Sequence, residues 1–226
     1  MQVYVPGGQY SGEWSLINCY DIRCIGIQDV AHEMCDHTRT FYPLCNDMSA
    51  QNYTTYEILQ QTSVAKMLGM LATSRIFVMN THGDQNSVQV YQDDLELQTI
   101  NELPDNALAH LDLVLYVACE TAKGGAGADN LVNATASKGA NLVIGFQESI
   151  YCSESDIWVP AFFNALGEGK TVEEAINDAH LEVATKWTLD DLDDMKSDYE
   201  STSVGFVPPT QSIYYVGDGQ TILRNW

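Results

Sequence analysis

Two short apolar runs dominate the middle of the chain, and each stops at a reactive side chain. The first spans residues 76–81 and ends in His82-Gly83, and the second spans residues 113–118 and ends in Cys119. Runs of this length that are rich in β-branched and aromatic residues are typical of buried strands. The pattern therefore predicts two strands whose ends carry a histidine and a thiol.

The rest of the chain alternates between strand-like and helix-like patterns. Further strands are expected at residues 14–21, 140–146, 212–216 and 220–223, with a β-hairpin at residues 87–97. Helical spacing of apolar residues predicts helices at residues 27–40, 54–71, 106–111, 128–138, 156–166 and 171–186. Strands that alternate with helices favour the α/β class, with a mainly parallel sheet covered by helices on both faces.

The length of the chain is compatible with one domain. It has 226 residues, of which 45% are hydrophobic, and this is enough for a sizeable core. We expect a single domain over residues 1–226, with residues 1–12 as an N-terminal extension. Residues 188–203 are acidic and poor in large apolar side chains, and we expect them to form a surface insert.

Acidic residues strongly outnumber basic ones. Thirty-one Asp and Glu against ten Lys and Arg give a formal net charge of −21. This charge disfavours nucleic acid and anionic membranes as partners, and it is explained equally well by a preference for basic substrates or by solubility. The sequence also lacks a long apolar run and a signal-peptide pattern in its first ten residues. We expect a soluble protein that is either cytoplasmic or secreted after processing.

Cysteine usage separates one thiol from the others. Cys19, Cys24, Cys35 and Cys45 lie near the N-terminus, and their spacing leaves open whether any of them form a disulfide. Cys119 stands apart from them, at the end of a predicted strand. A thiol in that place is often only a small buried hydrophobe, and a His-Gly pair is common. Their joint placement at two strand ends is much more specific.

The two strand ends together favour nucleophilic catalysis. In an open α/β sheet, ligands bind beyond the carboxyl ends of the strands. A free thiol is mostly protonated at neutral pH, so a neighbouring base is needed to activate it. We therefore interpret His82 as a general base and Cys119 as a nucleophile. The main-chain N–H groups of Gly83 and Cys119 are candidates for an oxyanion hole, and residues 123–127 are expected to form a mobile glycine-rich loop.

The motifs around these residues resemble those of a known group of enzymes. The segments IFVMNTHGD and LVLYVACET are similar to the His-Gly and Ala-Cys signatures of caspase-like (clan CD) cysteine peptidases, among which the clostripain-like, gingipain-like and CHAT-domain proteins are nearest. The segment KGGAGADNLVNATASKGANLVIGF resembles the CHAT pattern, and YYVGDGQTIL resembles the closing strand of such domains. The resemblance covers roughly residues 13–226 and is strongest from 75 to 146. It implies a caspase-like three-layer sandwich and a Cys/His dyad formed by Cys119 and His82.

Substrate preference is less clear from the sequence. Relatives that cleave after Arg or Lys often carry an acid two residues before the cysteine, where this chain has Val117. In CHAT-like and separase-like proteins, acids after the next strand help to bind a basic side chain, and Glu148 or Asp156 are the candidates here. The alternative is that these two residues cap the following helix or face water.

We therefore expect a cysteine endopeptidase that acts on peptide or protein substrates, with a lean to Arg or Lys at the first position (P1). No cofactor and no metal site are expected, and the oligomeric state is left open. The alternative is a caspase-like interaction or regulatory module with little or no turnover.

Overall fold

The computed structural model describes residues 2–6, 14–18, 24–29, 55–59, 63–90, 92–186 and 212–223. The expected acidic insert at residues 188–203 lies outside these residues. Cys19, Cys35 and Cys45 lie outside them too, so the possible disulfides among the N-terminal cysteines stay untested. Within the described part of the chain, no helix is both long and apolar enough to cross a membrane.

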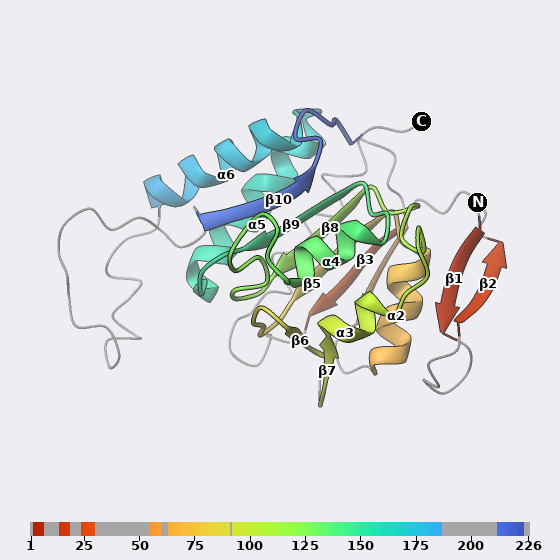
Figure 1. The fold of residues 1–226 in the computed structure, drawn as a ribbon. Coiled ribbons are helices and arrows are strands. Elements are labelled where there is room, and N and C mark those ends of the chain that lie inside the picture. The colour runs from red at the N-terminus through yellow and green to blue at the C-terminus, as the bar shows by residue number, and fades with distance from the viewer. Residues whose placement is uncertain are drawn as a thin grey trace.

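Six strands form the central sheet, in the order β10-β9-β8-β5-β3-β4 (Figure 1). Neighbouring strands are parallel except for β10, which pairs antiparallel with β9 at one edge. The strands are β3 (Cys24–Asp29), β4 (Thr55–Leu59), β5 (Ile76–Asn80), β8 (Leu113–Val117), β9 (Leu142–Phe146) and β10 (Ile213–Gly217). This confirms the expected mainly parallel sheet.

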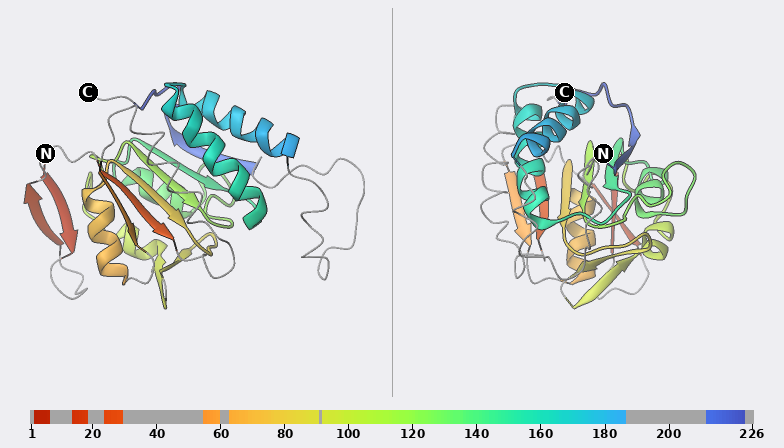
Figure 2. Two further views of the ribbon diagram at one scale, coloured as in Figure 1. Left: turned by 180° about the vertical axis from the view of Figure 1, so that it is seen from behind. Right: turned by 90° about the vertical axis from the view of Figure 1, so that its left-hand side faces the viewer.

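Helices cover both faces of this sheet (Figures 1 and 2). The buried side chains form two clusters, one between the sheet and α5 and α6, the other between the sheet and α2, α3 and α4. The helices are α2 (Val64–Thr73), α3 (Leu97–Asn101), α4 (Leu131–Ser137), α5 (Cys152–Gly167) and α6 (Val172–Lys186). Burial of both faces explains why the strands contain near-continuous apolar runs.

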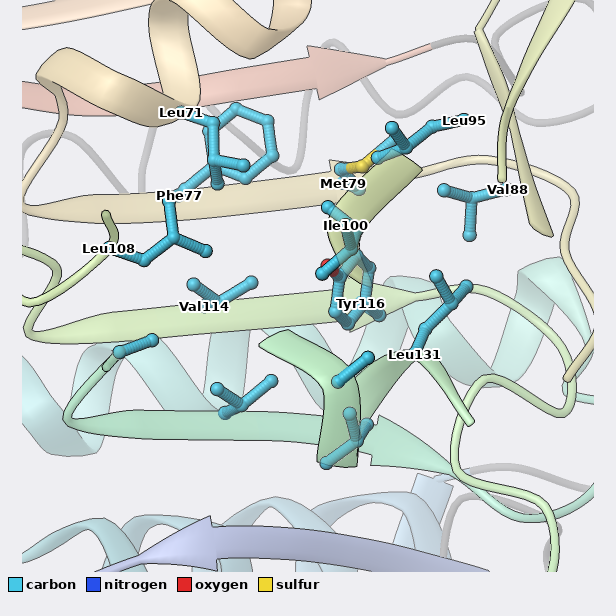
Figure 3. Packing of buried hydrophobic residues seen from close by; sticks show 14 of the residues in the cluster. Leu71, Phe77, Met79, Val88, Leu95, Ile100, Leu108, Val114, Tyr116 and Leu131 are labelled. Carbon is cyan, nitrogen blue, oxygen red and sulfur yellow. The ribbon is translucent and has the colours of Figure 1, made fainter. Parts of the chain in front are cut away.

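The central strands β5 and β8 are buried over their whole length. Their side chains alternate between the two clusters, so that Phe77, Val114 and Tyr116 pack towards α2 and α4 (Figure 3). Tyr116 is polar at its tip, and its hydroxyl is 2.7 Å from that of Thr135 on α4. Burial raises the pKa of Tyr116 to about 12, so this phenol stays neutral and hydrogen-bonded in the core.

Two antiparallel hairpins accompany the central sheet. One joins β1 (Gln2–Pro6) to β2 (Trp14–Asn18), and the other joins β6 (Ser87–Val90) to β7 (Asp93–Glu96). The β6–β7 hairpin confirms the one expected at residues 87–97. Residues 14–18 form a strand within the predicted range of 14–21, and this strand pairs with β1 in the expected N-terminal extension.

Several predicted elements are wrong. Residues 24–29 form β3 where a helix was expected from residue 27, and residues 55–59 form β4 where a helix was expected from residue 54. Residues 106–111 form turns, and the helix in this region is α3, which precedes them. Residues 220–223 do not form a strand. The remaining predicted strands and helices are present with shifts of a few residues at their ends.

The amino ends of β5 and β8 are held together by an ion pair. The Arg75 guanidinium donates to both carboxylate oxygens of Asp112, from Nε at 2.9 Å and from Nη2 at 2.6 Å. In the same region, Nε2 of the buried His110 donates a hydrogen bond to the Leu71 carbonyl oxygen at 3.1 Å. A bidentate pair fixes orientation as well as distance, so it sets the alignment of the two strands from the end opposite their reactive residues.

The burial of His110 predicts a pH dependence of stability. Burial lowers the pKa of His110 from its ordinary value of 6.5, and the hydrogen bond to Leu71 and the charge of Asp112 offset this only in part. Below about pH 6.5, His110 is therefore protonated in the unfolded chain but stays neutral in the folded one. Because the unfolded state binds the extra proton, the free energy of unfolding decreases as the pH falls. In urea denaturation at pH 7.5, 6.0 and 5.0, His110→Gln should lose less stability over this range than the unaltered protein. Equal losses in the two proteins would contradict the assignment.

Candidate active site

His82 and Cys119 lie side by side at the carboxyl edge of the central sheet. In the parallel pairing of β5 with β8, Asn80 is level with Val117. The pairing continues one residue further, because the Thr81 N–H donates to the Val117 carbonyl oxygen at 3.1 Å. His82 lies two residues after Asn80, and Cys119 lies two residues after Val117. The register of the two strands therefore places both residues at the same level of the sheet edge.

The backbone at Gly83 packs directly against the segment that carries the thiol. A Cβ atom at Gly83 would lie 3.0 Å from the Ala118 Cβ and 3.3 Å from the Cys119 carbonyl oxygen, and 3.0 Å from a methyl group of Val88. Such distances are tighter than ordinary van der Waals contact. Glycine is therefore the residue that allows the His82 segment to approach Cys119 this closely.

The His82 segment is fixed by the β6 strand that follows it. The Gln89 N–H donates to the His82 carbonyl oxygen at 2.9 Å, and the Thr81 hydroxyl donates to the Gln89 carbonyl oxygen at 2.8 Å. The His82 side chain itself is exposed. A rigid backbone that carries an exposed imidazole is suited to proton transfer with a substrate.

Cys119 is half-buried and carries a free thiol. Its Sγ lies 3.7 Å from the Ile150 carbonyl oxygen, in the segment between β9 and α5. The thiol is a weak donor, so this contact costs little free energy to break. The side chain is thus neither packed in the core nor fully open to solvent.

The chain turns sharply directly after the thiol. Glu120 has a φ of 55°, a left-handed conformation that costs a residue with a Cβ about 1–2 kcal/mol. The turn is held by two hydrogen bonds to the end of β9, from the Glu120 N–H to Glu148 O at 3.1 Å and from the Ala122 N–H to Phe146 O at 2.9 Å. Strained conformations of this kind persist where the surrounding structure enforces them, often at functional sites.

Two backbone donors at the site make no hydrogen bond to the part of the chain that the structure describes. Within the described residues, the N–H groups of Gly83 and Cys119 make no hydrogen bond, although those of Asp84 and Glu120 beside them do. Backbone N–H groups in folded proteins are nearly always paired with protein or water. These two donors lie on the two segments that meet at Gly83, and they are available to a bound group.

Several charged side chains surround the turn. The Lys123 ammonium lies 2.5 Å from the Glu120 carboxylate, and the Ser149 hydroxyl lies 3.5 Å from the other oxygen of that carboxylate. The hydrogen bond and charge of Glu120 raise the pKa of Lys123, with smaller contributions from Glu148 and Asp84. Acids from three separate segments thus lie close enough to Lys123 to raise its pKa and stabilise its positive charge.

The expected specificity residues differ in their surroundings. Glu148 is exposed beside the turn, and Asp156 is half-buried near the start of α5. Val117 is 2% exposed and packs in the cluster beneath α5 and α6, so its side chain does not reach the surface. Glu154, on the first turn of α5, is fully buried. Within the described residues, no group of three His, Cys, Asp or Glu side chains is arranged to hold a metal ion.

One residue near the site was missed from sequence. Asn130 is fully buried and caps α4, and its amide also donates to the loop that follows Cys119. The signal was present, because an Asn directly before an apolar run is a typical helix N-cap. The helix was predicted to begin at residue 128, which placed Asn130 inside it and hid its role as the N-cap.

Comparison with known proteins gives the following matches. A model of the CHAT domain family matches residues 68–214 of the chain. No curated protein matches the sequence. The structure is similar to that of gingipain R, an Arg-specific cysteine proteinase, with a TM-score of 0.68 and 9% identity over 89% of this chain and 47% of that chain.

Two further structures have the same arrangement. The complex of the pro- and mature domains of Porphyromonas gingivalis RgpB gives a TM-score of 0.64 and 10% identity over 88% of this chain and 48% of that chain. The Saccharomyces cerevisiae separase–securin complex gives a TM-score of 0.58 and 11% identity over 86% of this chain and 11% of that chain. The chain therefore spans less than half the length of these proteins, and the likeness concerns the fold alone.

The family match extends from α2 to β10 and includes both reactive strand ends. The structural matches agree with it, since gingipain and separase have the caspase-like fold. The chain therefore belongs to the CHAT domain family, and its fold is that of the caspase-like clan CD peptidases.

Proposed function

We propose that the chain is a cysteine endopeptidase in which Cys119 attacks the peptide carbonyl and His82 transfers the protons. The observation that carries this proposal is that these two residues lie at the same level at the ends of adjacent strands. Beside them are two backbone N–H groups that have no hydrogen-bond partner among the described residues. A base, a thiol and oxyanion donors on one sheet edge are the parts that acyl transfer requires.

The reaction follows from these positions. His82 takes the thiol proton of Cys119, and the resulting thiolate attacks the carbonyl carbon. The negative charge moves to the carbonyl oxygen, which the Gly83 and Cys119 N–H groups stabilise by hydrogen bonding. His82 then donates its proton to the leaving amine as the C–N bond breaks, which leaves a thioester on Cys119. Water, deprotonated by His82, hydrolyses this thioester and restores the thiol.

We also propose that the enzyme prefers substrates with Arg or Lys at P1. This preference is supported by the net charge of −21 and by the acids near the site, of which Glu148 and Asp156 are our candidates for contact with the substrate.

A labelling experiment tests this function. Peptide chloromethyl ketones with Arg, Lys, Leu or Asp at P1 alkylate a thiol that is activated within a peptide-binding site. We expect an adduct on Cys119, identified by mass spectrometry, that forms faster than on the other thiols and fastest with Arg or Lys. The preference for the Arg and Lys ketones over the Leu and Asp ketones should weaken in Glu148→Gln or Asp156→Asn. It should not weaken in the control Asp94→Asn, which removes an exposed charge from β7.

The outcomes separate the hypotheses. If Cys119 reacts fast with all four ketones alike, the chain is a peptidase without the proposed P1 preference. If Cys119 reacts no faster than the other thiols with either the ketones or iodoacetamide, the peptidase proposal is wrong, and an interaction module becomes the better account.

A further inference from the structure

The glycine-rich loop after Cys119 is firmly attached to the rest of the protein, contrary to the mobile loop expected from its sequence. Gly124, Gly125 and Gly127 all have positive φ angles, so the loop is a series of tight turns. Their conformation is fixed by side-chain amides. Asn130 and Asn133 together donate three hydrogen bonds to carbonyl oxygens of this loop and a fourth to Ala128 O directly after it.

Asn130 is the buried centre of this arrangement. Its Nδ2 donates to Lys123 O at 3.1 Å and to Gly125 O at 3.3 Å, and its Oδ1 accepts from the Asn133 N–H at 2.9 Å. Its side chain is fully buried, so a lost bond would leave a polar atom without water to replace it. One amide thus caps α4 and holds the loop at the same time.

Asn133 extends the arrangement to the edge of the sheet. Its Nδ2 donates to Gly125 O and Ala128 O, each at 2.9 Å, and its Oδ1 accepts from the Tyr214 hydroxyl on β10 at 3.1 Å. The loop is therefore tied through α4 to the last strand of the sheet, far from Cys119 in sequence.

Short backbone hydrogen bonds connect the loop to the turn that directly follows Cys119. The Lys123 N–H donates to Glu120 O, and the Gly125 N–H donates to Ala122 O, each at 2.9 Å. Lys123 is thus bound to the strained Glu120 turn through its N–H and to Asn130 through its carbonyl. On the other side, the Gln85 amide donates to Asp129 O at 2.9 Å, which links the same loop to the His82 segment.

We propose that Asn130 is a positioning residue for the peptidase reaction: its amide holds the loop that keeps Glu120 left-handed and the Cys119 N–H directed at the substrate oxygen. Asn130 does not itself touch the substrate. This inference rests on the proposed peptidase function. It predicts that disturbing Asn130 impairs stabilisation of the oxyanion and leaves the thiol itself reactive.

Asn130→Asp tests this prediction with a minimal change. The new carboxylate still accepts the hydrogen bond that caps α4, but it presents an oxygen instead of an N–H to Lys123 O and Gly125 O. We expect kcat for a peptide substrate to fall roughly 100-fold, since small misplacement at a reacting centre has effects of this size. KM should change much less. Asn141→Asp introduces the same charge at an exposed position and serves as the control.

Two ligands distinguish positioning from a general loss of structure. A peptide aldehyde forms a tetrahedral adduct with Cys119 that needs the oxyanion donors, whereas iodoacetamide alkylates the thiol without forming an oxyanion. In Asn130→Asp the aldehyde affinity should fall about as much as kcat, roughly 100-fold, and the alkylation rate of Cys119 should stay unchanged. Parallel losses of both would show a structural role only and overturn the proposal.

The remaining outcomes are also decisive. If the unaltered protein cleaves peptides and Asn130→Asp retains its kcat and aldehyde affinity, the positioning role is wrong while the peptidase function stands. If the unaltered protein neither cleaves peptides nor binds the aldehyde, both proposals fail. If Asn130→Asp does not fold, Asn130→Ser takes its place, because a serine hydroxyl still caps α4 whereas both amide bonds to Lys123 O and Gly125 O are lost. It should lower the aldehyde affinity severalfold with alkylation unchanged, and the absence of this loss overturns the proposal.

Discussion

Cys119→Ala is expected to abolish peptide hydrolysis, and His82→Ala to lower kcat by roughly 100- to 10,000-fold. Alanine at position 119 removes the atom that forms the acyl-enzyme, so no covalent route remains. Alanine at position 82 leaves the thiol but removes the group that takes its proton and returns it to the leaving amine. Initial rates of cleavage of a peptide that carries the P1 residue of the fastest-reacting ketone measure both effects.

Both variants should fold. The His82 side chain is exposed and Cys119 is half-buried with one weak hydrogen bond, so neither supports the core. Thermal unfolding followed by circular dichroism should therefore change little. His110→Gln is the matched control for the histidine, because it alters a buried imidazole at the opposite end of the sheet and should leave kcat at neutral pH unchanged. Activity that survives both alanine variants would show that the dyad is wrong.

Gly83→Ala is expected to reduce kcat by roughly 100-fold in a protein that still folds. The new Cβ would meet the Ala118 Cβ and a Val88 methyl group at 3.0 Å, and the Cys119 carbonyl oxygen at 3.3 Å. The two segments must move apart by a few tenths of an ångström to relieve these contacts. The separation changes the spacing of the Gly83 and Cys119 N–H groups, and oxyanion stabilisation depends strongly on such spacing.

Gly69→Ala is the matched control for this variant. Its Cβ would meet nothing within 4 Å, and it lies in the middle of α2, where alanine is the better helix former. It should raise the free energy of unfolding by up to about 1 kcal/mol and leave kcat unchanged. A Gly83→Ala protein with normal kcat would show that the close approach at Gly83 has no catalytic role.

The strands that carry the candidate site were predictable from sequence for a physical reason. Strands β5 and β8 are buried on both faces, so their residues are apolar except for Asn80 at the end of β5, and the apolar runs stop near the edge of the core. His82 and Cys119 stand out because they are the first reactive side chains beyond that boundary. Their alignment also follows from topology, since adjacent parallel strands end at the same edge of the sheet.

The N-terminal part of the sheet was not predictable in the same way. Ile27, Val30, Ala31 and Met34 have helical spacing, yet Ile27 belongs to the parallel strand β3. A short strand that pairs with neighbours on both sides cannot be distinguished from a helical turn by periodicity alone. The same ambiguity affected β4, which directly precedes the real start of α2 at its Ser63 cap.

The details around the thiol depend on tertiary contacts that no local pattern encodes. Glu120 adopts a left-handed conformation although Glu has no preference for it, because bonds to the end of β9 and the contact with Lys123 enforce the turn. The glycine-rich loop likewise looked mobile from its composition, and its order comes from the amides of Asn130 and Asn133 on α4.

The double attachment of β5 to β8 has a consequence for how the protein tolerates change. Backbone pairing joins the two strands up to Val117, and the Arg75–Asp112 ion pair joins them at their amino ends. The distance between His82 and Cys119 is therefore set by the strands themselves. It does not depend on the residues between the β6–β7 hairpin and Asp112. Doubling the length of such a connection costs only about 0.6 kcal/mol in closure entropy. The exposed Asp105-Asn106 turn is therefore a place where a foreign peptide or a whole reporter module can be grafted while the sheet edge keeps its geometry.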